Sequence, residues 1–585
     1  MSRNDEVAAL FEEFADLLEA QDVSYKPQTY RRAAENIREY PQPIEAVAAD
    51  GEAALEEIDG VGDAISAKVV EYFETGTIEE LEEARADLPV DMAGLTRVEG
   101  VGPKTVGRLY EALGVETLDD LEAAARAERI REVKGFGAKT EENILENIPF
   151  ARETRERSLL GDARPVADDL LAYLAGHDAV VDAEVAGSIR RWRETVGDID
   201  VLVASREAES VVAAFTDWDA ATGVIESGES KASVRVDGER VDLRVVVPDE
   251  YGAALQYFTG SKEHNVTLRN RAIARGLKMN EYGVFDVGDV EDPDAGQRVG
   301  ERVAGETEEG MYAALDLAWM PPELREDTGE VEAAAADDLP ELVTTEDVRG
   351  DLHTHTDWSD GRATLEEMLA GAEERGYDYH AVTDHATGPG MVGGVGLSDG
   401  ELEEQMGVVR DAADAVGIEV FHGVEANIDA EGGLSVGESL LEELDIVVAS
   451  PHAALDQDRK TATDRLVRAV EHPQVDVLGH PTGRLLNRRK GLELDEERIA
   501  EAAAESGTAL EVNANPHRLD LSGSGVRAAV EAGARVVVNT DAHSPGELEY
   551  VRYGVHTARR GWAESADVLN TREAGEVRAF LGLDG

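Results

Sequence analysis

Short apolar runs alternate with longer amphipathic segments through the second half of the chain. The apolar runs cover residues 379–385, 418–425, 446–452, 475–480, 509–513 and 535–543. Segments between them, such as residues 365–375 and 496–506, carry apolar residues at helical spacing. Buried strands that alternate with helices are typical of a parallel α/β fold. Together with a short strand around residues 353–355, the pattern predicts a seven-stranded, distorted α/β barrel.

The first 150 residues instead predict short helices, among them residues 5–20 and 64–73. Three similar turns separate these helices: I-D-G-V-G at 58–62, V-E-G-V-G at 98–102 and V-K-G-F-G at 133–137. Glycine lets the N–H groups at a helix start face outward, where they can hold a phosphate. A single Gly-x-Gly is equally typical of a helix cap. Three such turns, each opening a helix, favour contact with a phosphate backbone.

Residues 158–250 predict β-branched strands at 180–185, 199–204, 233–236 and 240–247, in an α+β arrangement. Asp198 and Asp200 share one face of the second strand, because side chains alternate along a strand. Asp242 lies on a candidate neighbouring strand, so three carboxylates can converge. Asp-x-Asp alone is commonly a metal-free pair. Three oxygens with space for phosphates suit Mg²⁺, and two such ions hold the attacking and leaving oxygens in phosphoryl transfer.

A second set of metal-type side chains follows the apolar runs of the second half. His353 and His355 lie two residues apart in H-T-H and share a strand face, and Asp360 follows in the next loop. Most of the other runs end in histidine, aspartate or glutamate, where α/β barrels place catalytic residues. Residues 509–513 end without an obvious ligand. Imidazole and carboxylate donors suit Zn²⁺ or Mn²⁺, and the sequence does not choose between them.

The number of histidines limits this interpretation. The chain has thirteen histidines, of which eleven follow residue 345, so not all of them can be ligands. A single histidine of the set would more often be structural. Their joint placement at strand ends favours a metal centre.

Composition changes the picture in one respect. The chain has 56 Lys and Arg against 124 Asp and Glu, a formal net charge of −68, which would ordinarily argue against a nucleic-acid partner. Because the acidic excess is spread over all segments, we interpret it as the adaptation of a halophile to molar salt, where the Debye length falls to about 3 Å. The absence of cysteine excludes disulfides and thiolate metal sites. Without a long apolar run or hydrophobic leader, we expect a soluble cytoplasmic protein that does not contact membranes.

The motifs H-T-H…D-G, T-D-H, G-V-E, S-P-H, G-H-P and T-D-A-H, from about residue 345 to residue 578, resemble the polymerase-and-histidinol-phosphatase (PHP) metallohydrolase family. The resemblance implies up to three Zn²⁺ or Mn²⁺ ions. Their ligands would be His353, His355, Asp360, His385, Glu425, His452, His480, Asp541 and His543.

The G-S…R-R…G-D-I-D…V-D-L-R set, residues 257–269 and L-K-M-N-E-Y-G-V-F at 277–285 resemble the palm and thumb of family X DNA polymerases. The glycine turns are similar to helix-hairpin-helix DNA binders. The resemblance implies catalysis by Asp198, Asp200 and Asp242 with two Mg²⁺ (or Mn²⁺). Nucleotide contacts would come from Gly187, Ser188, Arg191, Tyr257, Phe258, Gly260 and Asn265. DNA contacts would come from Gly60, Gly62, Gly100, Gly102, Gly135, Gly137, from Arg240 beside the primer end and from Arg269 on the template side.

The stretch Y-R-R-A-A at 30–34 also resembles the lyase domain of that family, and Lys68 falls where that domain holds its Schiff-base lysine. Ala64 replaces a lysine of that site, so fewer cations would activate Lys68. Two interpretations stay open: a lyase nucleophile, or an exposed helix lysine near the DNA.

The predicted domains are a lyase-like helical domain (1–85), a fingers-like domain (86–150), the palm (151–250), the thumb (251–320), a linker (321–345) and the PHP domain (346–585). We expect a monomeric gap-filling repair polymerase that uses deoxynucleoside triphosphates on gapped or primed DNA. Its PHP domain would be a 3′→5′ exonuclease or 3′-end phosphoesterase. Two alternatives remain: a DNA-docked PHP phosphoesterase without polymerase activity, and a polymerase whose PHP domain is purely structural.

Overall fold

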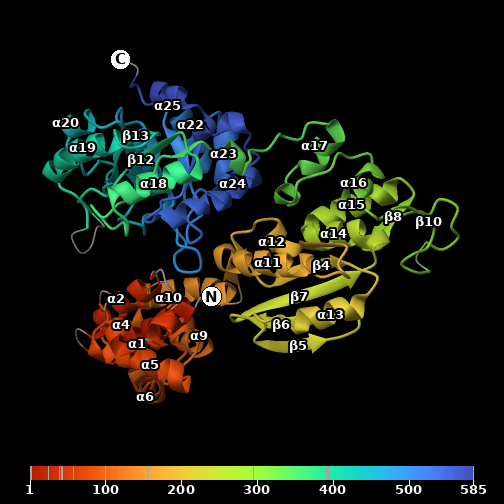
Figure 1. Ribbon diagram of the computed structural model, residues 1–585, viewed down its shortest axis with the longest axis horizontal. Helices are drawn as coiled ribbons and strands as arrows, with labels where there is room; N and C mark the ends of the chain where they lie inside the picture. Colours follow the sequence, from red (N-terminus) through yellow and green to blue (C-terminus); the bar gives the residue numbers. More distant parts are fainter. Residues whose placement is uncertain are drawn as a thin grey trace. The chain divides into compact units, whose positions relative to one another are not determined.

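The computed structural model describes residues 3–23, 26–38, 40, 44–49, 51–56, 58, 60–98, 100–155, 157–293, 295–389 and 395–583. The chain forms two compact units, Met1–Ser158 and Leu159–Gly585. Figure 1 draws the first unit in red and orange.

The first unit is helical, as the sequence predicts. Its helices are α1 (Arg3–Ala20), α2 (Lys26–Arg38), α3 (Ile44–Ala49), α4 (Glu52–Leu55), α5 (Asp63–Thr75), α6 (Glu79–Asp87), α7 (Met92–Leu95), α8 (Pro103–Leu113), α9 (Leu118–Arg126) and α10 (Ala138–Arg155). Phe11 and Phe14 of α1 lie 5.7 and 4.8 Å from the Tyr30 ring of α2. A Cβ at Gly107 would come within 2.0 Å of the Ala20 carbonyl oxygen, so α8 can approach α1 only with glycine there.

Strand β1 (Ser158–Leu159) spans the boundary of the two units, and the second unit continues with α11 (Leu160–Ala175) and a five-stranded sheet in the order β2-β4-β7-β6-β5. The strands are β2 (Asp182–Val185), β4 (Ile199–Ala204), β5 (Gly223–Ser227), β6 (Lys231–Val236) and β7 (Glu239–Val246). Strand β4 matches its predicted bounds, whereas β5 was not predicted. Its residues are all exposed, so it lacks the apolar alternation that marks a half-buried strand. Helix α12 (Gly187–Arg190) and β3 (Thr195–Val196) precede β4, and α13 (Ala208–Thr216) follows it.

Two helices, α14 (Tyr251–Thr259) and α15 (Lys262–Ala274), lead into a three-stranded antiparallel sheet. Its strands are β8 (Leu277–Asn280), β9 (Gly283–Asp286) and β10 (Glu301–Ala304). Helices α16 (Glu308–Ala313) and α17 (Glu330–Ala336) follow, the second within the predicted linker. Two charged residues of that linker, Glu323 and Arg325, are buried.

The C-terminal part is a parallel sheet of seven strands in chain order. The strands are β11 (Gly350–Asp351), β12 (Tyr379–Val382), β13 (Glu419–Asn427), β14 (Ile446–Ser450), β15 (Val477–Leu478), β16 (Ala509–Asn513) and β17 (Val536–Asn539). A bridge between Thr354 and Ala542 joins the two outer strands, so the barrel is nearly closed. This confirms the predicted seven-stranded barrel. Strand β11 ends at Asp351, so His353 and His355 flank the bridging residue rather than lying within a strand.

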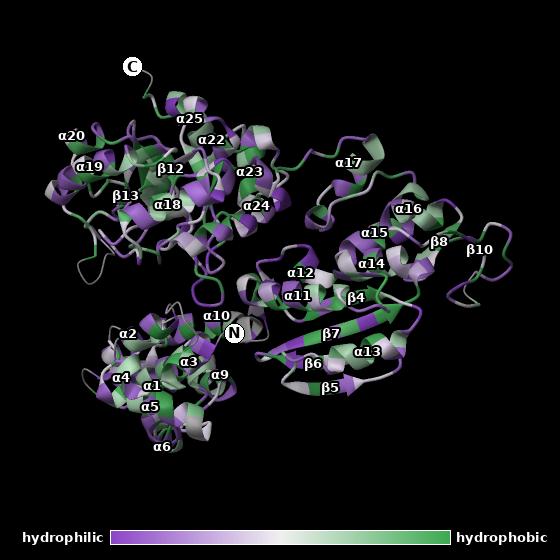
Figure 2. Cartoon of the chain, in the orientation of Figure 1, coloured by the Kyte–Doolittle hydropathy of each residue, from purple (hydrophilic) through white to green (hydrophobic). Residues whose placement is uncertain are grey.

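The helices around the barrel are amphipathic, and the barrel strands are buried. The helices are α18 (Leu365–Arg375), α19 (Asp399–Ala413), α20 (Glu438–Leu441), α21 (Arg459–Val470), α22 (Glu496–Ser506), α23 (Gly523–Ala532), α24 (Val551–Arg560) and α25 (Ala574–Phe580). Figure 2 shows hydrophilic and hydrophobic residues side by side on them. Strands β12, β14, β16 and β17 are buried along their whole length. Among the described residues, no helix is long and apolar enough to cross a membrane.

Candidate active sites

Three aspartates converge at one end of the five-stranded sheet. Asp200 of β4 lies opposite Asp242 of β7 in a parallel pair, and Asp198 lies just before β4. One oxygen from each of the three carboxylates lies within 4.8 Å of the other two. Carboxylates this close repel one another unless a cation lies among them. The group therefore fits divalent cations with oxygen ligands.

Asp200 is the most perturbed member of this group. Burial, followed by the negative charges of Asp198 and Asp242, raises the pKa of Asp200 to about 7. A divalent cation among the carboxylates would favour their ionised forms. Gly187, at the start of α12, has φ +62°, and a Cβ there would come within 2.5 Å of Asp200 Oδ2. The backbone can pass this close to the carboxylate only because position 187 is glycine.

Arg240 lies directly beside the carboxylates. Its Nε donates to both oxygens of Asp242, at 2.9 and 3.0 Å. Arg269, by contrast, is exposed on α15. The structure therefore joins the residue expected at the primer end to the aspartates, and leaves the residue expected on the template side at the surface.

Arg191 is held against the end of α14. Its Nε donates to Glu326 Oε1 at 3.0 Å, and its Nη1 donates to the carbonyl oxygen of Thr259 at 2.6 Å. Ser188, on the preceding helix α12, is half-buried. Two residues expected to contact phosphates thus lie next to the segment that carries Tyr257 and Phe258.

That segment is internally bonded. Asn265 Nδ2 donates to the carbonyl oxygen of Tyr257 at 2.7 Å, and Asn265 Oδ1 accepts from Gln256. A Cβ at Gly260 would come within 2.8 Å of Asn265 Oδ1. The residues expected to line the sugar and to reach the base are therefore neighbours. The Arg244 guanidinium also lies over the Phe258 ring, with Cζ 4.4 Å from the ring centroid.

Seven of the nine candidate ligands in the barrel fall into three overlapping groups at its C-terminal end. The groups are His355, Asp360, His385 and His543; His353, His355 and Glu425; and His385, Glu425 and His452. In each group the donor atoms lie within 4.8 Å of one another. The shared residues His355, His385 and Glu425 join the groups into one centre. Its chemistry, imidazole with carboxylate, fits transition-metal ions such as Zn²⁺ or Mn²⁺.

The two remaining candidates lie at the edge of this centre. His480 Nε2 is 2.8 Å from Glu425 Oε1, and Asp541 Oδ1 is 3.0 Å from His355 Nε2. Both residues have positive φ, +23° for His480 and +54° for Asp541. Left-handed backbone is uncommon for residues other than glycine and gathers at functional sites. The turns at the strand ends aim these side chains at the centre.

Several donor atoms of the centre have no hydrogen-bond partner within the described part of the chain. They are His353 Nε2, His355 Nδ1, His385 Nδ1, His452 Nε2, His480 Nδ1 and Glu425 Oε2, all of them buried. Buried polar atoms are nearly always satisfied, so a group of orphaned atoms calls for an explanation. Cations bound among the three groups would satisfy such atoms.

The opposite nitrogens of three histidines are fixed by oxygen acceptors. His353 Nδ1 is 2.7 Å from Glu511 Oε1, His452 Nδ1 is 2.7 Å from Asn427 Oδ1, and His543 Nδ1 is 2.8 Å from the Asp541 carbonyl oxygen. Ligand histidines typically donate their second N–H in this way, which orients the ring and sets its tautomer. The Nε2 atoms of all three rings are therefore available to metal ions.

Glu511 was missed by sequence reasoning. It lies in β16, the strand without an obvious ligand, and is fully buried. Its oxygens also accept from the backbone N–H of His480 at 2.7 Å and from Asn539 Nδ2 at 3.0 Å. A glutamate inside an apolar strand was the available signal, because a buried carboxylate needs partners.

Opposing charges set the protonation of the centre. Burial would lower the pKa of His385, but the carboxylates of Glu425 and Asp360 raise it to about 10. For His452 burial dominates over the nearby Glu425 and lowers the pKa to about 4. Burial would raise the pKa of Glu425, but surrounding histidines hold it well below its usual range. The protein thus keeps this carboxylate ionised, as a metal ligand requires.

The three glycine turns of the first unit have the same geometry. Gly60, Gly100 and Gly135 have φ of +73°, +82° and +97°. In each turn the residue after this glycine donates its backbone N–H to a carbonyl oxygen three residues earlier, at 2.9–3.1 Å. The pairs are Val61 and Ile58, Val101 and Val98, and Phe136 and Val133. Gly62 and Gly102 are the N-caps of α5 and α8, and Gly137 directly precedes α10. Gly62, Gly100, Gly102, Gly135 and Gly137 are exposed, as a backbone-binding turn requires.

Lys68 is not the exposed helix lysine that one interpretation assumed. Only 9% of its side chain is accessible. Its Nζ donates to Glu80 Oε1 at 3.1 Å and to the Ala64 carbonyl oxygen at 3.3 Å. That interpretation is wrong because the aliphatic stem of Lys68 is packed into the helical core. The burial restricts access of a sugar carbon to this amine, which the ion pair with Glu80 also holds in place.

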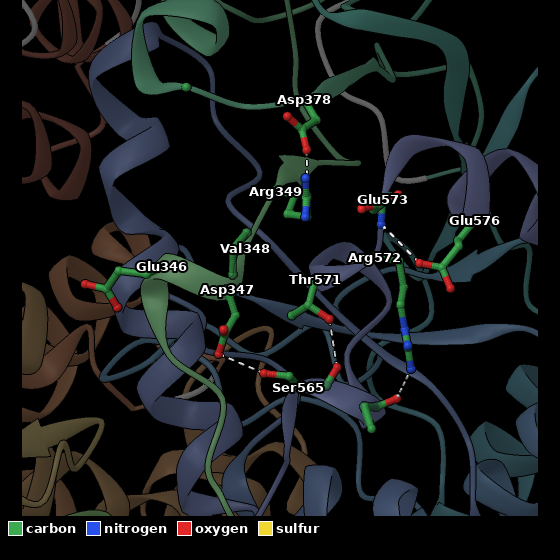
Figure 3. Close-up of a pocket in the computed structure, with 12 residues that line it drawn as sticks. Glu346, Asp347, Val348, Arg349, Asp378, Ser565, Thr571, Arg572, Glu573 and Glu576 are labelled. Carbon is green, nitrogen blue, oxygen red and sulfur yellow. Dashed lines mark hydrogen bonds and ion pairs between the residues drawn. The ribbon is translucent and has the colours of Figure 1, made fainter.

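The opposite, N-terminal end of the barrel carries a separate hollow, drawn in Figure 3. Several of its charged residues are partnered: Arg349 Nε donates to Asp378 at 2.6 Å, and Asp347 accepts from Ser565 at 2.8 Å. Residues at the N-terminal end of an α/β barrel usually contribute to stability rather than to catalysis. The chemistry lies at the other end.

Comparison with known families covers most of the chain in four segments. Residues 2–78 match the helix-hairpin-helix domain, and residues 92–148 match the SAM-like helix-hairpin-helix tandem. Residues 254–326 match the DNA polymerase beta thumb, and residues 351–515 match the PHP domain.

Comparison with individual proteins finds a relative along the full length. The DNA polymerase/3′-5′ exonuclease PolX of Bacillus subtilis (strain 168) is 34% identical over 582 residues, which cover 98% of this chain and 99% of the relative. Two proteins named probable phosphatases match one part only. That of Thermoanaerobacter sp. (strain X514) is 31% identical over 244 residues, 40% of this chain and 93% of the relative. That of Shewanella sp. (strain MR-4) is 33% identical over 203 residues, 33% of this chain and 75% of the relative. The chain therefore belongs to the family X DNA polymerases that carry helix-hairpin-helix domains and a C-terminal PHP domain.

Proposed function

We propose that the protein is a DNA-directed DNA polymerase that fills short gaps during repair, and that its PHP domain is a 3′→5′ exonuclease that also processes blocked 3′ ends. The observation that carries this proposal is that one chain has two separate candidate metal centres, one of three aspartates and one of histidines with carboxylates. One has only carboxylate oxygens, and the other mixes imidazole with carboxylate. The full-length relative is named for both activities.

In the palm, Asp198, Asp200 and Asp242 would hold two Mg²⁺ (or Mn²⁺). These ions supply positive charge to the reacting phosphate and lower the pKa of the attacking hydroxyl. Arg240, which donates to Asp242, would orient this carboxylate beside the primer end. Ser188 and Arg191 would hold the outer phosphates of the incoming deoxynucleoside triphosphate. Tyr257, Phe258 and Gly260 would line its sugar, and Asn265 would reach its base.

In the PHP domain, the nine candidate ligands would hold up to three Zn²⁺ or Mn²⁺ ions. Such ions supply a water-derived nucleophile at neutral pH and neutralise the phosphate charge. Glu511 and Asn427 fix the rings of His353 and His452. The free Nε2 atoms of the two rings both face Glu425 Oε1, at 3.5 and 3.3 Å. Asp541 and His480 close the edge of the centre.

DNA would bind through the exposed glycine turns, with Arg269 on the template side. Backbone N–H groups suit a protein with so much negative charge, because contacts that depend only on Lys and Arg weaken steeply with salt. We infer that the acidic surface is an adaptation to high intracellular salt. We further infer that the enzyme acts as a monomer in the cytoplasm.

One experiment tests both activities. A gapped duplex with a labelled primer is incubated in concentrated KCl with Mg²⁺ or Mn²⁺, with and without nucleotides. We expect Asp198→Ala to abolish extension and retain 3′ trimming, and His353→Ala to do the reverse. Extension that survives in Asp198→Ala and Asp200→Ala would exclude the palm assignment. Trimming that survives in His353→Ala would favour a structural PHP domain, and trimming without any extension by the wild type would favour a DNA-docked phosphoesterase.

A further inference from the structure

The loop between α12 and β3 carries Arg191 and Trp192, and much of its support comes from the PHP barrel. The Trp192 ring stacks on the ring of His556 in α24, with the centroids 3.5 Å apart and the planes at 5°. Tyr553 of the same helix meets Trp192 edge-on at 6.0 Å. On the palm side, the Arg164 guanidinium of α11 lies 4.8 Å from the Trp192 ring centroid. Trp192 is therefore packed between two domains.

Polar contacts reinforce this packing at the residue before Trp192. Arg560, at the end of α24, donates from Nη1 to the Arg191 carbonyl oxygen at 2.8 Å and to Glu326 Oε1 at 3.1 Å. The same Glu326 oxygen accepts from Arg191 Nε at 3.0 Å. One carboxylate oxygen thus joins the barrel arginine to the guanidinium that would hold a nucleotide phosphate. All three side chains are largely buried.

The orientation of His556 is itself fixed. Its Nδ1 lies 2.7 Å from Glu323 Oε1, which also accepts from Arg559 Nε at 2.7 Å. Burial would raise the pKa of Glu323, but His556 and Arg559 lower it to about 2. Because Glu323 is ionised, His556 Nδ1 must be the donor. The ring plane that meets Trp192 is therefore held by a charge-assisted hydrogen bond.

We propose that α24 of the PHP barrel is a positioning element of the polymerase site, in which His556 and Arg560 hold the loop that carries Arg191, at the end of the helix that carries Ser188, ready for the triphosphate. This inference rests on the polymerase activity proposed above. A loop that is ordered in advance does not lose conformational entropy when the nucleotide binds. The contribution of α24 is therefore to nucleotide affinity, and the 3′-trimming chemistry of the same barrel does not depend on it.

The test is single-turnover incorporation across a nucleotide series, on a primer whose 3′-terminal phosphorothioate resists trimming. We expect His556→Ala and Arg560→Ala each to raise the dissociation constant for the nucleotide about tenfold. The maximal incorporation rate should change less than the affinity. His556→Phe keeps a flat ring against Trp192 and should remain within about threefold of the wild type, since the stack rather than the Glu323 bond touches the loop.

Arg535→Ala is the matched control, because Arg535 is an exposed barrel arginine that packs on Phe580 and not on the palm. It should leave nucleotide affinity unchanged. Trimming of an ordinary primer, measured on the same preparations, should be unchanged in all four variants. Wild-type affinity in both His556→Ala and Arg560→Ala would overturn the proposal. An equal loss of trimming and of affinity would also overturn it, because that would indicate a damaged barrel. Failure of the wild type to extend any primer would instead refute the polymerase function itself.

Discussion

Asp200 on β4 lies opposite Asp242 on β7 in a parallel strand pair, and the Asp200 carboxylate leaves no space for a side chain at position 187, which is glycine. The backbone therefore brings the carboxylates together before any cation binds. Such a preorganised site costs stability in the metal-free protein, because like charges are held close in a half-buried position. The gain is that the ligands need not rearrange when metal and nucleotide arrive.

The first prediction concerns pH. The folded pKa of Asp200, about 7, lies above its ordinary value of 3.8, so the folded state binds this proton more tightly than the unfolded state. The resulting stabilisation is complete below the ordinary value and is lost as the pH rises towards 7. The stability gained by Asp200→Asn over the wild type, in chelator, should therefore grow across this range. Denaturant unfolding of both proteins measures it, and a difference that does not change with pH would contradict the prediction.

Saturating Mg²⁺ provides the complementary measurement. A cation among the carboxylates replaces the proton as the stabilising charge. The wild type should then gain more stability from Mg²⁺ than Asp200→Asn does at pH values above 7. Equal gains in the two proteins would mean that the ion binds elsewhere.

The second prediction concerns Glu511, which holds His353 and the backbone of His480. Glu511→Gln keeps the shape but weakens the acceptor, and we expect the PHP domain to lose about 10- to 100-fold in metal affinity. The concentration of Mn²⁺ required for half-maximal trimming measures this loss, and primer extension should be unaffected. Glu501→Gln, an exposed change on α22, is the control. Unaltered metal dependence in Glu511→Gln would show that His353 needs no such partner.

The third prediction separates DNA contact from backbone strain in the first unit. Gly100 and Gly114 both have positive φ, +82° and +70°, and a Cβ at either would meet nothing within 4 Å. Gly100→Ala and Gly114→Ala should therefore destabilise the fold by a similar amount, about 1 kcal/mol. Only Gly100 lies in a glycine turn, whereas Gly114 is the C-cap of α8.

We therefore expect Gly100→Ala alone to weaken binding to a gapped duplex, as measured by fluorescence anisotropy. The salt dependence should change little, because the lost contact is to a backbone N–H rather than to a lysine or arginine. Equal binding by both variants would exclude this turn as a DNA contact.

The sequence predicts β12 to β17 well because each is an apolar run that ends in a polar residue, and β16 lies at its predicted bounds. The first strand, β11, has no such run and lies before the predicted residues 353–355. The sequence predicts the convergence of Asp200 and Asp242 for the same reason as β12 to β17, since both lie on apolar strands. It could not predict that Glu511 supports His353, because this pairing joins residues 158 positions apart. Nor could it show that Lys68 is buried, because helical periodicity does not determine how deeply a long side chain packs.

The last prediction concerns Lys68 and lyase activity. A Schiff base requires a neutral amine that can reach an exposed sugar carbon. Lys68 instead has only 9% of its side chain accessible, and its Nζ is held by Glu80 at 3.1 Å. We expect borohydride reduction with a 5′-deoxyribose-phosphate duplex to trap no adduct at Lys68. Peptide mapping after reduction identifies any modified lysine, and polymerase beta serves as the positive control.

Glu80→Gln removes the ion pair but not the burial, so it should not create trapping either. An adduct at Lys68 in the wild type would show that the helices around α5 open far enough to admit a DNA end, and would restore the lyase function.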